Sequence, residues 1–161
     1  MTPRIARALF SVLIYAAPIA VCAFEVGEFK SGMAQERVLQ MLRTQGFKIT
    51  QQSPTSFFAQ RESEFHSLGF CNSRLTFFSS GVPGGIRGFI RRVTQISNQY
   101  GQGDLGSLSS ETNVGEINSL SVTWLLGPDT LRVTYFAQSE RSAESQSVAW
   151  FTRSECRDRM Q

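Results

Sequence analysis

Residues 83–101, P-G-G-I-R-G-F-I-R-R-V-T-Q-I-S-N-Q-Y-G, predict the central helix of the fold. Its apolar residues recur at helical spacing and form one stripe, made of Ile86, Phe89, Ile90, Val93, Ile96 and Tyr100. The opposite side carries polar residues, namely Arg87, Arg91, Arg92, Gln95 and Asn98. Pro83 opens the helix, and Gly101 can cap its end in a left-handed conformation. A stripe this continuous must be covered, so we expect the neighbouring strands to pack against it.

The rest of the chain predicts one more helix and six strands. The first helix spans residues 31–45, with Ser31 as its cap and Gly46 as its stop. Three strands are expected before the central helix and three after it, at residues 47–49, 56–61, 74–79, 119–126, 131–138 and 147–153. We therefore predict an α+β fold of two tandem helix-plus-three-strand units, in which an antiparallel sheet carries both helices on one face.

Two connections in this scheme lack a clear pattern. Residues 62–73 are expected to be irregular. Residues 101–116 are rich in Gly, Ser and acidic side chains, and predict a long loop that is either a functional flap or simply mobile.

Two helices on one face leave the other face of the sheet open to water or to a partner. In the expected register its outward positions are mostly Ser, Thr and Gln. Phe78, Leu125, Phe136 and Arg132 would also lie there and form a possible partner-binding face. The alternatives are ordinary scattered exposure of apolar residues, or cover by the long loop.

The start of the chain has the pattern of a secretory signal. Arg4 and Arg7 precede an apolar stretch, and Val21-Cys22-Ala23 offers small residues to a signal peptidase. We expect cleavage after Ala23, which leaves residues 24–161 as a single domain in the periplasm or outside the cell. The alternatives are an uncleaved membrane anchor and a lipoprotein acylated at Cys22, although Val21 is an unusual residue before a lipidated cysteine.

Cleavage removes most of the excess positive charge. The chain has 16 basic and 13 acidic residues, and only two basic residues precede position 24. The 138 residues that remain carry a net charge of +1, which does not indicate a nucleic-acid partner. Stable membrane insertion is not expected after cleavage.

Catalytic motifs are mostly missing. The sequence contains no P-loop, no H-E-x-x-H, no C-x-x-C and no G-x-S-x-G pattern, and it has one histidine. The one local cluster is Glu62, Glu64 and His66, which in an extended segment would project from one side. It could hold a divalent metal weakly or transfer a proton. The alternative is a solvated loop edge, so we predict no cofactor and no metal site.

One resemblance accompanies these patterns. Gly32-Met33, followed by Val38 and Leu42, resembles the G-M-x-x-x-x-V-x-x-x-L helix of small outer-membrane-assembly lipoproteins. The doubled order of helix and strands looks like the fold of the β-lactamase inhibitor protein, a secreted binding module. The resemblance implies an architecture and a binding role. The chain departs from the lipoproteins at Val21, and no site residue is carried over.

Two function classes follow from the sequence. One is a non-enzymatic binding or envelope accessory protein that recognises an unidentified protein or envelope glycan. The other is a small exported hydrolase or metal-dependent enzyme that uses Glu62, Glu64 and His66. The missing catalytic motifs favour the binding protein.

Cysteine usage gives the first testable prediction. Cys71 and Cys156 both remain after cleavage and form one pair in an oxidising compartment. We expect them to be bridged, with a stabilisation of roughly 4 kcal/mol because the closed loop is long. Mass mapping of the exported protein without reduction should recover the linked peptides. Two free thiols would contradict the prediction, as would Cα atoms more than about 7 Å apart.

Overall fold

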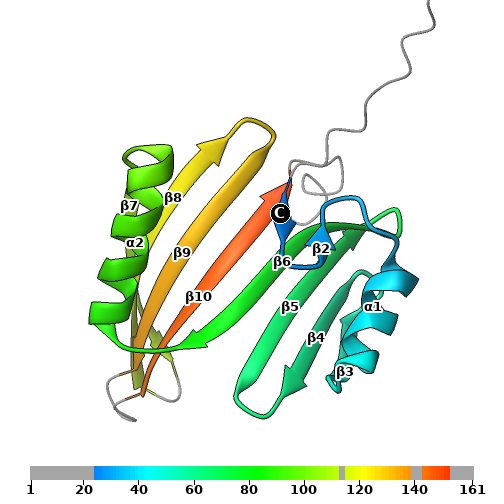
Figure 1. Ribbon diagram of the computed structural model, residues 1–161. Helices are drawn as coiled ribbons and strands as arrows, with labels where there is room; N and C mark the ends of the chain where they lie inside the picture. Colours follow the sequence, from blue (N-terminus) through cyan, green and yellow to red (C-terminus); the bar gives the residue numbers. More distant parts are fainter. Residues whose placement is uncertain (1–23, 113–114, 139–142, 153–161) are drawn as a thin grey trace, which may run out of the picture.

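The computed structural model describes residues 24–112, 115–138 and 143–152 (Figure 1). In these residues the chain forms two helices, an eight-stranded antiparallel sheet and a small two-stranded hairpin, so the predicted α+β class is confirmed. The expected signal segment and Cys156 lie outside the described residues. The elements in chain order are β1 (Glu25–Val26), β2 (Phe29–Lys30), α1 (Gln35–Thr44), β3 (Lys48–Ser53), β4 (Ser56–Arg61), β5 (Glu64–Cys71), β6 (Arg74–Pro83), α2 (Ile86–Tyr100), β7 (Asp104–Thr112), β8 (Gly115–Leu126), β9 (Asp129–Gln138) and β10 (Ala143–Thr152).

The strand order of the large sheet is β3-β4-β5-β6-β10-β9-β8-β7. β10 is therefore inserted between β6 and β9, while β3 and β7 form the two edges. Each helix is followed by four strands in the sheet, so the expectation of three is wrong. The additional strands are β5 and β7, which cover the segments expected to be an irregular connection and a loop.

The strand β6 contains a bulge that reverses its alternation. Gly69 pairs with Phe77, but the next residue of β5, Phe70, pairs with Leu75, so Thr76 has no partner in the register. Leu75 and Phe78 consequently both point toward the helices and are buried at 0% and 3% exposure. The expected register placed Phe78 on the opposite face, and that placement is wrong.

One row of large side chains shows which face the helices cover. Paired positions run across six neighbouring strands through Phe57, Leu68, Phe78, Trp150, Leu131 and Trp124. Directly opposed residues share a face of a sheet, so all six lie on one side. α1 packs Val38 and Leu42 against one end of this row, and α2 packs Phe89 against the other. Both helices therefore cover the same face (Figure 1), which is called the helix face below.

The core has two clusters that meet at Trp150. The first gathers α1 with β4, β5 and β6, and the second gathers α2 with β8 and β9, while the indole of Trp150 packs against both. The β1–β2 hairpin closes the first cluster. The ring centroids of Phe29 and Phe78 lie 4.8 Å apart, and those of Phe24 and Trp150 lie 6.4 Å apart.

The first helix begins later than expected. Its N-cap is Ala34, which makes no side-chain cap hydrogen bond, so the prediction of Ser31 as the cap is wrong. The hydroxyl of Ser31 instead lies 2.9 Å from the hydroxyl of Thr152. Ser31 therefore connects the end of β2 to β10, the last strand in the chain.

Phe89 is the one fully buried residue in the apolar stripe of the second helix. Phe89 is 5% exposed, whereas Ile86 and Ile90 are 37% and 56% exposed. Gly101 ends the helix with φ of 85° and ψ of −170°, a positive φ that favours glycine. Its carbonyl accepts a hydrogen bond from the indole Nε1 of Trp124 at 2.9 Å, which fixes the helix end to β8.

This packing predicts unequal effects of two substitutions on α2. Phe89→Ala should lower the free energy of unfolding by roughly 3–5 kcal/mol, because it leaves a cavity over β9. Arg91→Ala should change it by less than about 0.5 kcal/mol, because Arg91 is exposed. Urea unfolding followed by circular dichroism measures both values. Small and equal effects would mean that α2 is not part of the core.

Candidate functional site

The face of the sheet opposite the helices is called the open face. Across its middle, paired positions run through Ser67, Ser79, Ala149, Arg132 and Thr123. These residues are small or polar, unlike the row on the helix face. α1, α2 and the β1–β2 hairpin all pack on the helix face, so none of them covers this surface.

Two aromatic rings and one guanidinium form a cluster on the open face. Phe77 of β6 and Phe151 of β10 are directly paired, and their ring centroids are 4.8 Å apart. The guanidinium carbon of Arg132 lies 5.5 Å from the centroid of the Phe151 ring, within the range of a cation–π contact. The Nε of Arg132 also donates a hydrogen bond to the hydroxyl of Thr123 at 3.2 Å. Phe77, Phe151 and Arg132 are called the aromatic–arginine cluster below.

A second aromatic pair lies toward the β4 side of the same face. Phe58 and Phe65 stack with ring centroids 6.0 Å apart. The ring of Phe65 lies over Gly81 of β6, where an added Cβ would come within 1.8 Å of a ring carbon. Gly81 therefore makes room for the ring, and any larger residue there would displace it.

The structure separates the four residues of the predicted partner-binding face. Arg132, Leu125 and Phe136 lie on the open face, and Leu125 and Phe136 are 74% and 39% exposed. Phe78 is buried in the core instead. Sequence reasoning missed Phe77 because the bulge in β6 exchanges the roles of Phe77 and Phe78. It also missed Phe151, although the alternation of Val148 and Trp150 with Ala149 and Phe151 carried that signal.

Glu62, Glu64 and His66 do not converge on one site. Glu62 lies in the β4–β5 turn with φ of 51°. The carboxylate of Glu64 forms an ion pair with Arg61, at 2.5 Å from its Nη2. His66 points to the helix face, where its ring centroid is 4.9 Å from Phe47 and 5.2 Å from Phe78. In the part of the chain that the structure describes, no group of three His, Cys, Asp or Glu side chains is placed to hold a metal ion.

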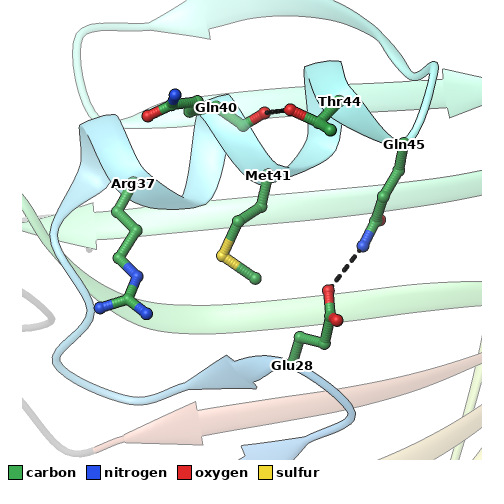
Figure 2. A pocket seen from close by; sticks show the side chains of 6 residues that line it. All are labelled: Glu28, Arg37, Gln40, Met41, Thr44 and Gln45. Atoms are coloured by element: carbon green, nitrogen blue, oxygen red, sulfur yellow. Dashed lines mark hydrogen bonds between the residues drawn. The ribbon is translucent and has the colours of Figure 1, made fainter.

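A hollow of about 450 Å³ lies between α1 and the turn that joins β1 to β2 (Figure 2). Its one hydrogen bond between side chains runs from Nε2 of Gln45 to a carboxylate oxygen of Glu28, at 2.8 Å. Arg37 lies at the other end of the hollow, and Met41 lies between them. Glu28, Gln45 and the guanidinium of Arg37 give the hollow a largely polar lining around Met41. Its lining is Glu28, Arg37, Gln40, Met41, Thr44 and Gln45.

Comparison with protein families, curated proteins and solved structures finds no match for this chain. Within the described ranges, no helix is both long and apolar enough to span a membrane. Cys71 is buried at 7% exposure at the end of β5, and its expected bridge to Cys156 remains a prediction.

His66 gives a testable pH dependence. Burial lowers its pKa below the ordinary value of 6.5, while the Glu64 carboxylate raises it and the Arg61 guanidinium lowers it. Its Nδ1 is buried and has no hydrogen-bond partner among the residues that the structure describes. The unfolded chain therefore binds a proton more readily than the folded chain, so stability is lost as the pH falls below 6.5.

His66→Phe should remove this part of the pH dependence, because a phenyl ring packs among the same aromatic neighbours without titrating. Urea unfolding of both proteins between pH 8 and pH 5 measures the difference. Identical slopes for the two proteins would contradict the assignment.

Proposed function

We propose that this chain is an exported, non-enzymatic binding or envelope accessory protein that recognises a partner through the open face of its sheet. The observation that carries the proposal is the aromatic–arginine cluster. It lies on a face that both helices and the β1–β2 hairpin leave uncovered. This arrangement presents a rigid apolar and cationic surface to a partner.

The geometry of the cluster supports recognition. Aromatic and Arg side chains supply most of the binding energy at protein interfaces. The Thr123 hydroxyl and the Phe151 ring hold Arg132 in place, so little side-chain entropy is lost when a partner binds. The surrounding Ser and Thr hydroxyls can exchange hydrogen bonds with water for bonds with a partner.

A protein partner fits this surface better than a glycan does. Leu125 and Phe136 add two exposed apolar anchors on the same face as the cluster. Apolar anchors of this kind fill pockets on protein surfaces. An envelope glycan would use the ring faces and hydroxyls but would leave Leu125 uncovered.

The proposal extends to the architecture. Two tandem units, each a helix followed by strands, would give a symmetric scaffold of the β-lactamase inhibitor type. The order of elements supports this idea, because α1 precedes β3 to β6 and α2 precedes β7 to β10. The sheet order also supports it, since each unit runs from its first strand at one edge to its last strand at the centre.

The enzyme alternative has less support. Proton transfer or metal hydrolysis needs titratable groups that converge in a cleft. Glu64 forms an ion pair with Arg61, and His66 lies among phenyl rings on the helix face.

The proposed export to the periplasm or the exterior of the cell rests on the signal pattern of residues 1–23.

Affinity capture from envelope extract with paired variants tests the proposed surface. Arg132→Ala and Leu125→Ser should each reduce recovery of a partner by about tenfold or more, the loss typical of interface anchors. Arg37→Ala on α1 is the matched surface control, and His66→Ala tests the enzyme alternative. Both should bind as the wild type does.

The other outcomes are distinct. Loss of capture with Arg37→Ala but not with Arg132→Ala would move the site to the helix face. A partner that survives protease treatment of the extract but not glycosidase treatment would be a glycan. Loss of function only in His66→Ala, with the fold intact, would favour the enzyme.

A further inference from the structure

Exposed apolar side chains are distributed unequally over the molecule. In the described chain, every large hydrophobic residue with high exposure lies between α2 and β9, and none lies in the half that contains α1. These residues are Ile86, Ile90, Tyr100, Leu105, Leu108, Leu125 and Phe136. Exposure concentrated in one half marks that half for interaction with a partner.

The edge strand β7 lies at the centre of this distribution. It pairs with β8 in an unbroken register, and every residue from Asp104 to Glu111 is exposed. It contains no Lys, no Arg, no Pro and no bulge, which are the usual devices that prevent an edge from pairing. The opposite edge, β3, has both an exposed Lys48 and a register shift. The fold thus protects one edge and leaves the other able to pair.

Apolar side chains flank the β7 edge on both faces. Leu105 is paired with Val122 and lies on the helix face, where it is 74% exposed. Leu108 is paired with Ser119 and lies on the open face, where it is 67% exposed. An added strand would therefore find one apolar contact on each side of the sheet.

The charge of this region selects the kind of strand. Between Val93 and Leu131 the sequence has four carboxylates and no Lys, Arg or His. Two of the carboxylates, Asp104 and Glu111, are exposed near the ends of β7. Across the sheet, Arg132 lies on β9, two strands away from the edge.

We propose that β7 binds an extended, basic segment of a partner protein, which adds to the sheet as a further strand. Backbone hydrogen bonds along the edge would supply affinity, and the carboxylates at its two ends would select a basic sequence. A second copy of this chain fits less well. In antiparallel pairing of β7 with β7 of a second copy, Asp104 of each copy would lie near Glu111 of the other. These carboxylates would repel each other, because no basic residue lies between them.

The positions of the side chains along β7 define a peptide that tests the proposal. In an antiparallel strand opposite Asp104–Glu111, basic residues belong at the two ends and apolar residues belong opposite Leu105 and Leu108. The peptide Arg-Thr-Thr-Val-Thr-Thr-Val-Arg meets these requirements. It should bind the exported protein, and raising NaCl from about 50 mM to about 500 mM should weaken the binding, because the charges are exposed.

Two control peptides separate strand addition from loose attraction. Replacing both Arg with Glu should abolish binding through charge repulsion. N-methylation of alternate backbone amides keeps the charge of the peptide but removes hydrogen-bond donors. In an antiparallel pair only every second N–H group points toward the partner strand, so one of the two alternate methylation patterns should block binding and the other should not.

Three protein variants locate the site. Glu111→Lys and Leu108→Lys should each weaken peptide binding by roughly tenfold, because each replaces a favourable cross-strand pair with an unfavourable one. Lys48→Glu, on the opposite edge, should leave it unchanged, as should Arg132→Ala, which separates this edge from the open face. Thermal unfolding by circular dichroism shows that each variant is folded.

Several results would overturn the proposal. They are no binding of the basic peptide to the wild type, equal binding of both N-methylated peptides, and unchanged binding to Glu111→Lys and Leu108→Lys. Sedimentation showing a dimer that Leu108→Lys dissociates would instead make a second copy the occupant.

Discussion

The fold depends on the insertion of β10 between β6 and β9. Trp150 is paired with Phe78 on one side and with Leu131 on the other, and it packs against both core clusters. Without this strand, the two clusters would have no shared side chain and the sheet would be two smaller sheets. Each would then expose an additional edge, β6 or β9, and each would have a smaller hydrophobic face. The same strand places Phe151 between Phe77 and Arg132, so the candidate site depends on it as well.

The parts of the fold that repeat a simple pattern could be predicted from the sequence. The stripe of α2 and the alternation of β8 and β9 located those elements, because one side of each meets the core. β7 could not be found in this way, since both of its faces are exposed and its Gly and Ser residues carry no alternation. β5 was missed for a different reason. Glu64 and His66 occupy two of its helix-face positions, so the apolar residues on that face are only Leu68 and Phe70.

The candidate site was predicted in part for the same physical reasons. Arg132, Leu125 and Phe136 were placed correctly because β8 and β9 pair without interruption. Phe78 was exchanged with Phe77 because the bulge is a property of the strand pair and not of either strand alone. His66 shows a further limit. A single histidine next to two glutamates has the composition of a polar site, yet its ring lies among phenyl groups, which only the packing of α1 and the β1–β2 hairpin determines.

The central position of β10 also orders the events of folding. Phe78 and Trp150 are neighbours across the sheet but lie 72 residues apart in the chain. Hairpins such as β4–β5 and β8–β9 need only short loops and can close first, while closure of the long loop costs more entropy. β9 and β10 also form a hairpin, so β6 and β10 are the strands that stay unpaired until the two halves of the sheet meet. In a crowded compartment, β10 of one molecule could pair with β6 of another, so mispairing of these two strands between molecules is the form of misassembly that this topology invites.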